Sequence, residues 1–365
     1  MSGGRWVRLA AASAGAAAAA VTAGVVVERR VVRSRLAGAA GADELGSLRG
    51  QPTSVLTDDG VRLHVEVDEV APYTVEHRAE PEAGGAGEPT IVFVHGYALN
   101  LDCWHFQRAH FRGKHRLVLY DQRSHGRSGR SDQQHATIDQ LGHDLARVLA
   151  QVVPHGPVVL VGHSMGGMTL MAFAEHYPEV FAARVVGAAL ISTTAGGLKT
   201  HHVISRMIPD AVAGQLAPRI VAGLARAPGL VDRVRRRGSN IGFLVAHEFA
   251  FGEDVPDSYV EFVDNMLANT PFEVLAHFFP NFDSHDKFAV LESFSRVPTV
   301  ILTGTKDALT SVKHSRAMAE RLPEARLVES PGAGHMVILE QAEKVNATLA
   351  DLLATALGKP VRRVS

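Results

Sequence analysis

The residues of this chain whose types and spacing suggest chemistry begin with a serine between glycines, Gly162-His-Ser-Met-Gly166. An apolar run over residues 158–161 precedes this motif, and residues 168–175, which are typical of a helix, follow it. A strand, a tight turn with serine at its apex and a helix are the context of a nucleophile elbow. Such a turn exposes the Ser164 hydroxyl and brings the N–H of Met165 to the helix N-terminus, where it can face a developing oxyanion.

Two further residues fall at comparable places in the chain. Asp307 follows a predicted strand at residues 299–303, and His335 follows one at residues 325–328. Alone, each signal is weak, because a lone aspartate is more often a helix cap and a lone histidine is more often a hydrogen-bonded structural residue. Together with Ser164 they occur in the order serine, aspartate, histidine, each directly after its own predicted strand. This is one of the known chain orders of a catalytic triad.

A second oxyanion donor is predicted after the strand at residues 90–94, which runs into His95-Gly96-Tyr97. A glycine at the exit of a central strand lets the backbone bend toward a ligand, and the N–H of Tyr97 is the candidate donor. An ordinary strand-to-helix turn explains this segment equally well. The strand at residues 116–120 leads into the polar loop 121–128, which we interpret as a hydrogen-bonded brace for the neighbouring turns rather than as catalytic.

The elements that must position these residues alternate between strands and helices. A β-hairpin is predicted at residues 54–67, a strand at 185–191, and helices at 101–112, 138–153, 312–322 and 337–357. From residue 194 to 291 this alternation stops, and helical stretches rich in phenylalanine predict an inserted cap. The expected segments are an N-terminal segment and linker (1–45), a first part of the core (46–193), the cap (194–291) and a second part of the core (292–365).

The chain resembles the α/β-hydrolase superfamily, in its lipase/esterase-like branch. Five motifs in family order carry this resemblance: His95-Gly96-Tyr97, Asp121-Gln-Arg-Ser-His-Gly-Arg-Ser128, Gly162-His-Ser-Met-Gly166, Gly304-Thr-Lys-Asp307 and Gly332-Ala-Gly-His335. The resemblance covers residues 54–357 apart from the cap. It implies an α/β fold with a mostly parallel eight-stranded sheet, flanked by helices and carrying an inserted helical cap. One departure is Ser124, where the family's loop usually has glycine.

The resemblance implies a serine hydrolase of carboxylic esters, a class that extends to lipid-like esters. Ser164 would be the nucleophile, His335 the general base and then acid, and Asp307 the residue that orients His335. The backbone N–H groups of Tyr97 and Met165 would hold the oxyanion. Dehalogenases and epoxide hydrolases of similar fold place aspartate at the elbow, so serine argues against both. The alternatives are an acyltransferase or perhydrolase that uses the same acyl-enzyme, and a ligand sensor on a hydrolase scaffold.

The composition sets limits on partners and cofactors. The chain has 365 residues, of which 46% are hydrophobic, and a formal net charge of -1, so no global electrostatic case for nucleic acid exists. Its 19 histidines are scattered, and no cofactor or metal site is expected. Cys103 is the only cysteine, which excludes an internal disulfide. The expected partner is a small-molecule ester with an apolar acyl part, and the oligomeric state is left open.

The N-terminus predicts a second partner, the membrane. Residues 9–27 are uncharged and mostly apolar, and as a helix they would span about 28 Å. More arginines follow this stretch than precede it, which by the positive-inside bias places the downstream side in the cytoplasm. We therefore predict a membrane-anchored protein with a cytoplasmic catalytic domain. The alternative is export, because the small residues at 37–42 could host cleavage of a signal peptide. A third interpretation is an alanine-rich helix that packs on the domain.

Overall fold

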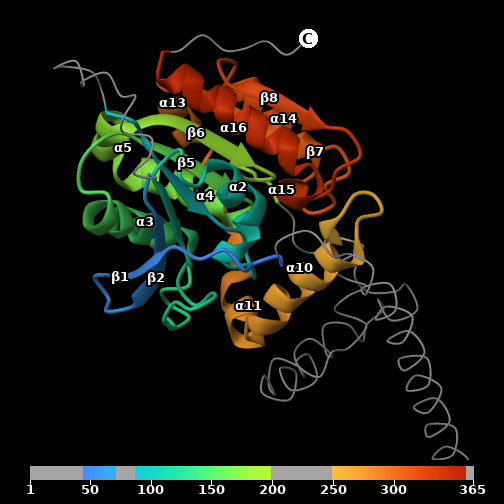
Figure 1. Ribbon diagram of the computed structural model, residues 1–365, viewed down its shortest axis with the longest axis horizontal. Coiled ribbons are helices and arrows are strands. Elements are labelled where there is room, and N and C mark those ends of the chain that lie inside the picture. Colours follow the sequence, from blue (N-terminus) through green and yellow to red (C-terminus); the bar gives the residue numbers. More distant parts are fainter. Residues whose placement is uncertain (1–43, 71–86, 199–248, 359–365) are drawn as a thin grey trace, which may run out of the picture. The chain divides into compact units, whose positions relative to one another are not determined.

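The computed structural model of this protein describes residues 44–70, 87–198 and 249–358. The described residues within 45–255 and 259–358 form one compact unit, which contains every predicted site residue. At the centre of this unit lies an eight-stranded sheet with helices on both faces (Figure 1). The predicted α/β fold with a mostly parallel eight-stranded sheet is therefore confirmed.

The strands follow the order β1-β2-β4-β3-β5-β6-β7-β8 across the sheet. The pairs β1/β2 and β2/β4 are antiparallel, and all other neighbouring pairs are parallel. After β3, the next strand in the chain, β4, lies on one side of it, and the following strand, β5, lies on the other side. This change of side makes a topological switch point, which is where α/β sheets tend to bind ligands. The bounds are β1 (Gln51–Leu56), β2 (Arg62–Asp68), β3 (Thr90–Val94), β4 (Leu117–Tyr120), β5 (Val158–His163), β6 (Val185–Ile191), β7 (Thr299–Gly304) and β8 (Arg326–Ser330).

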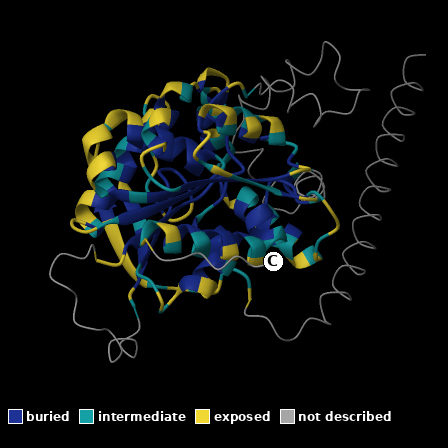
Figure 2. Cartoon of the chain, turned by 90° about the horizontal axis from the view of Figure 1, so that it is seen from above, coloured by how far each residue is buried: buried dark blue, intermediate teal, exposed yellow. Residues whose placement is uncertain are grey.

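The parallel strands are hydrophobic along their whole length because both faces of the sheet are covered. In β3, Ile91 and Phe93 join the apolar cluster on one face, and Val92 and Val94 join the cluster on the other. Figure 2 shows the strands buried between helices whose outer sides are exposed. The α-helices with residues in these two clusters are α2 (His105–Phe111), α3 (Ile138–Val152), α4 (Met165–His176), α5 (Pro178–Arg184), α10 (Asp257–Asn269), α13 (Leu291–Phe294), α14 (Val312–Arg321), α15 (Val337–Glu340) and α16 (Ala342–Ala356).

Two predicted helices differ from the observed ones. The segment predicted as one helix at 101–112 is a 3₁₀ helix, η2 (Leu101–Trp104), followed by α2. The segment predicted at 337–357 is broken at Gln341, whose φ of -127° and ψ of 50° are not helical. This break separates the short helix α15, which ends on Glu340, from α16.

Between β6 and β7 the described residues form helices and no strands: α10 (Asp257–Asn269), α11 (Phe272–Phe278), α12 (Asn281–Ser284), the 3₁₀ helix η3 (Phe288–Val290) and α13. The two ends of this helical insertion are joined at its base. Gly196 and Asp286 form an antiparallel bridge, and the N–H of Lys287 donates to the carbonyl of Ala195 at 2.6 Å. The division of the chain into four segments stays a prediction, since residues 1–43 and 199–248 lie outside the described parts.

The sequence-based localisation needs a correction. The stretch predicted as an anchor, residues 9–27, lies outside the described residues, and within the parts that are described no helix is long and apolar enough to span a membrane. The prediction of a membrane-anchored protein with a cytoplasmic catalytic domain is therefore not supported, and the membrane is not retained as a partner. The stretch that prompted it consists mostly of alanine, which contributes little to insertion.

Candidate active site

Three of the predicted motifs meet because their strands are neighbours. Val94 at the end of β3 pairs with Tyr120 on one side and with Gly162 on the other. Since these strands are parallel, the turns that follow them leave the same edge of the sheet. The loops beginning at His95, Asp121 and Ser164 therefore lie side by side.

Ser164 occupies a strained turn between β5 and α4. Its φ of 53° and ψ of -120° lie in a region that side-chain-bearing residues seldom adopt. The turn is tight because glycine stands on each side: a Cβ at Gly166 would overlap the carbonyl oxygen of Val94, and one at Gly162 would lie 2.6 Å from the carbonyl oxygen of Gly166. The local sequence thus permits a turn that holds the serine side chain away from the sheet.

The structure brings Ser164, His335 and Asp307 together in series. Nε2 of His335 lies 3.0 Å from Oγ of Ser164. Its Nδ1 lies 2.9 Å from Oδ2 and 3.1 Å from Oδ1 of Asp307. Asp307 and His335 are only 4% and 6% exposed, so the imidazole and its carboxylate partner are largely shielded from water. This geometry allows the imidazole to take a proton from the hydroxyl while the carboxylate orients the ring.

Asp307 is held by its own loop. The N–H groups of Leu309 and Thr310 both donate to Oδ1 at 2.9 Å, and the Thr310 hydroxyl donates to Oδ2 at 2.9 Å. These bonds leave the carboxylate little freedom to rotate, so its orientation toward His335 does not depend on that ring alone.

His335 is held from two sides. The ring of His163, next to the serine, donates from Nε2 to the carbonyl oxygen of His335 at 2.9 Å. Burial lowers the pKa of His163 to about 3, so this imidazole is neutral at physiological pH. On the other side, the Glu340 carboxylate accepts the N–H of Gly334 at 2.8 Å and the N–H of Gly252 at 2.9 Å. Glu340 therefore ties the histidine loop to the segment around Gly252, in the middle of the helical insertion.

The two predicted oxyanion donors lie next to the serine. Met165 is the first residue of α4, so its N–H has no acceptor within the helix. Gly96 packs against the elbow, since a Cβ there would lie 3.0 Å from Cβ of Ser164. Tyr97 follows Gly96, and its hydroxyl donates to the carbonyl of Leu275 in α11 at 2.6 Å.

The polar loop 121–128 braces these turns, as its sequence indicated. Asp121 is fully buried, and its carboxylate accepts the N–H of Leu101 and of Arg127, each at 2.8 Å. Burial raises the pKa of Asp121, and these two bonds act against that shift. Ser124 takes the left-handed conformation that glycine favours, with φ at 65°, and its hydroxyl accepts the N–H of Ser131 at 2.9 Å. The departure from glycine is thus accommodated locally.

Sequence reasoning did not single out three residues that hold this site: Gln122, His163 and Glu340. Gln122 and His163 stand inside motifs that were identified, but nothing in the spacing distinguished them from their neighbours. Glu340 stands within a segment that was predicted as an uninterrupted helix. Nothing in the sequence marks this residue, because the two N–H groups that its half-buried carboxylate accepts come from distant parts of the chain.

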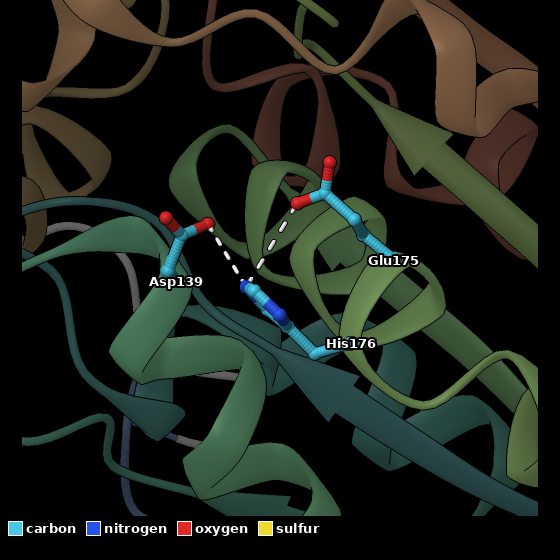
Figure 3. A group of neighbouring side chains, drawn as sticks. All are labelled: Asp139, Glu175 and His176. Atoms are coloured by element: carbon cyan, nitrogen blue, oxygen red, sulfur yellow. Dashed lines mark ion pairs between the residues drawn. The ribbon is translucent and has the colours of Figure 1, made fainter.

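A separate cluster on α3 and α4 has the residue types of a metal site. Asp139, Glu175 and His176 point toward one another (Figure 3), and their ligand atoms lie within 4.8 Å of each other. The ammonium group of Lys287 already contacts both carboxylates, lying 2.7 Å from Oδ1 of Asp139. Since this cation pairs with both acidic groups and His176 lies 3.3 Å from Asp139, we interpret the cluster as an ion-pair network at the base of the insertion.

Known proteins that resemble this chain indicate the family to which it belongs. The model of the alpha/beta hydrolase family matches residues 91–348. The chain is 27% identical over 264 residues to 3-oxoadipate enol-lactonase 2 of Acinetobacter baylyi, a match that covers 72% of this chain and 88% of that protein. It is 28% identical over 266 residues to the dihydrolipoyllysine-residue acetyltransferase component of the acetoin cleaving system of Pseudomonas putida. That match covers 73% of this chain but only 63%, less than two thirds, of the relative.

Among solved structures, the enol-lactonase of Burkholderia xenovorans has a TM-score of 0.63 and 24% identity, with 83% of this chain and 100% of that chain covered. This likeness concerns the fold. Because the family model spans most of the chain, the protein belongs to the alpha/beta hydrolase family. The family and fold expected from the sequence motifs are thereby confirmed.

Proposed function

We propose that this protein is a serine hydrolase that cleaves carboxylic esters through an acyl-enzyme on Ser164. The observation that carries the proposal is the series of contacts from Ser164 Oγ to His335 Nε2 at 3.0 Å and from His335 Nδ1 to Asp307 Oδ2 at 2.9 Å. A free serine hydroxyl is a poor nucleophile, and a hydrogen-bonded imidazole that takes its proton typically contributes 10²–10⁴-fold in rate, an order-of-magnitude value.

The proposed reaction has two halves. Ser164 Oγ attacks the ester carbonyl carbon while His335 Nε2 takes the hydroxyl proton, and the N–H groups of Tyr97 and Met165 stabilise the resulting oxyanion. The tetrahedral intermediate collapses to an acyl-serine, and the leaving alcohol takes the proton from His335. Water then attacks the acyl-serine with His335 again as base, which releases the carboxylic acid and restores Ser164.

Two features support an ester as the substrate. The enol-lactonase from Acinetobacter is named for a lactone, which is a cyclic ester, and it matches this chain over 88% of its length. The elbow carries serine rather than aspartate, so the intermediate would be an acyl ester of serine. An apolar cluster that includes Met165, Met168 and Phe278 lies beside the elbow and suits an apolar acyl part.

The test is turnover of p-nitrophenyl esters of graded chain length, combined with labelling by a fluorophosphonate probe. Ser164→Ala should abolish both, because it removes the attacking oxygen while the hydrogen bond to Ile191 from the backbone N–H of residue 164 can persist. The matched control is Ser295→Ala, a serine at ordinary φ of -67°, which should keep full turnover.

Undiminished ester turnover in Ser164→Ala would end the proposal. Product analysis with a competing alcohol or with peroxide separates hydrolysis from acyl transfer and perhydrolysis, because the same acyl-enzyme would then give a new ester or a peracid. Tight ligand binding with turnover near background would instead indicate a sensor on a hydrolase scaffold.

A further inference from the structure

The two proposed oxyanion donors stand on separate segments of the chain. Tyr97 follows β3, whereas Met165 begins α4 after β5. Their separation must match one oxygen atom, and donors are effective only about 2.7–3.1 Å from the position that the oxyanion takes. Local chain geometry cannot set this separation, since 67 residues lie between Tyr97 and Met165 in the sequence. A tertiary contact has to do so.

Gln122 makes such a contact. It follows β4 and is 0% exposed. Its Nε2 donates to the carbonyl oxygen of His95 at 2.7 Å. Its Oε1 lies 2.8 Å from the hydroxyl of Thr169, which in turn lies 3.0 Å from the carbonyl oxygen of Met165. One side chain therefore joins the segment two residues before Tyr97 to Thr169, which lies one turn beyond Met165 in α4.

The chemistry of these partners determines how the Gln122 amide is oriented. The carbonyl of His95 can only accept, so the NH₂ end must face it, and the oxygen then accepts from Thr169. The backbone N–H of Gln122 also donates to Nε2 of His95 at 2.9 Å, and Nδ1 of His95 donates to the carbonyl of Gly96 at 2.8 Å. Burial lowers the pKa of His95 to about 4, which keeps Nε2 free of a proton and able to accept this bond.

We infer that Gln122 is a positioning residue that sets the separation of the two oxyanion donors by linking His95 to Thr169. This inference rests on the proposed function, because it assigns a task within that same site. The task needs a donor at one end of the side chain and an acceptor at the other. Methionine has a similar shape and neither group, and glutamate lacks the donor for His95.

The test compares Gln122→Met with Gln107→Met. Gln107 is a matched control: it is also 0% exposed, and its amide donates to a backbone carbonyl, that of Ile338, at 3.0 Å. Gln122→Met should lower kcat for a p-nitrophenyl ester about tenfold or more while KM stays within about threefold, since losing a whole donor costs about 10²–10³ in kcat. Binding of a trifluoromethyl ketone, whose adduct with the serine carries the oxyanion, should weaken by the same factor as kcat/KM. Gln107→Met should change neither kcat/KM nor the affinity for the trifluoromethyl ketone.

Thr169→Val supplies the second variant, because it removes the hydroxyl at the other end of the link and keeps a β-branched shape. It should act in the same direction, and the double variant should lose little more than the larger single loss, because both changes break one link. The inference would be overturned if Gln122→Met had the same kcat/KM and the same inhibitor affinity as Gln107→Met. If Gln122→Met does not fold, the same comparison is made with Thr169→Val. Failure of the wild-type protein to turn over esters or react with fluorophosphonate would instead overturn the proposed function, so the two failures are distinguishable.

Discussion

At Ser164 the backbone and the side chain have opposing requirements. The turn demands a φ of 53°, which glycine adopts readily and serine does not. A hydroxyl is nevertheless present, and the strain costs about 1–3 kcal/mol. Neighbouring bonds hold the residue there: its N–H donates to the carbonyl of Ile191 at 2.9 Å, and its own carbonyl accepts the Thr193 hydroxyl at 2.7 Å. Strain kept at a reactive side chain is expected where function, rather than stability, determines the residue.

A pair of variants separates this strain from the chemistry. Ser164→Gly and Ser164→Ala should both be inactive, but the glycine variant should be more stable by about 1 kcal/mol, because it relieves the strain at a smaller entropic cost. Urea unfolding measures the difference. The same pair at Ser295, whose φ is -67°, should show the reverse order. Equal stability of the two variants at position 164 would contradict the strain assigned here.

At the scale of elements, the helical insertion is connected to the edge of the sheet that carries Ser164. Helix α11 reaches the loop after β3 through the Tyr97 hydroxyl, and the Tyr97 ring packs edge-on against Phe282 with ring centroids 5.2 Å apart. The insertion also reaches the histidine loop, where the N–H of Met336 donates to the carbonyl of Ala250 at 2.8 Å. Movement of these helices would therefore act on both sides of Ser164.

Tyr97→Phe tests the first of these connections. Removing the hydroxyl should lower the free energy of unfolding by about 1 kcal/mol, because Leu275 still accepts from the N–H of Phe279 at 3.1 Å. If the proposed function holds, KM should rise more than kcat falls, since the donor to the oxyanion is the backbone N–H. Tyr177→Phe is the control: its hydroxyl lies 3.0 Å from Nδ1 of His143, away from the site, so stability should fall without a change in KM. A fall in kcat alone for Tyr97→Phe would contradict this account.

At the scale of the whole molecule, buried histidines determine how stability depends on pH. Burial is the largest cause that lowers their pKa values, to about 4 for His95 and His285 and to about 3 for His125 and His163. In the unfolded chain a histidine has a pKa near 6.5, so below this pH the unfolded state binds protons that the folded state does not. Their contribution is therefore fully present above about pH 6.5 and is lost as the pH falls toward the folded values.

His125→Asn measures one such contribution. Nε2 of His125 is buried without a partner among the described residues, and its Nδ1 donates to the carbonyl of Arg123 at 2.9 Å, a bond that the asparagine amide can replace. Between about pH 7.5 and pH 5, the variant should lose about 2 kcal/mol less unfolding free energy than the wild type. Buried carboxyl groups with raised pKa, such as Asp121, act in the opposite direction but are common to both proteins. Parallel pH profiles would show that His125 titrates when folded.

Local patterns were sufficient for much of the fold and for the choice of site residues. Apolar runs predict buried strands, and the ends of β5, β7 and β8 lie within about two residues of where the sequence predicted them. Chain order then pointed to Ser164, Asp307 and His335, because parallel strands release their following residues at one edge of the sheet. The apolar run at residues 9–27 shows the limit of such patterns, since hydropathy reports the composition of a segment and not whether a membrane surrounds it.

The sequence by itself determined which residues could meet, and the tertiary structure decided which atoms do. Gln122 reads as one polar residue in a polar loop, and only the neighbouring positions of β3, β4 and α4 supply partners for both ends of its amide. The helix predicted across Gln341 breaks beside Glu340, whose carboxylate binds two distant N–H groups. Hydrophobic period is a local property of the chain, whereas a hydrogen bond requires two groups to be placed within fractions of an ångström by packing between elements far apart in sequence.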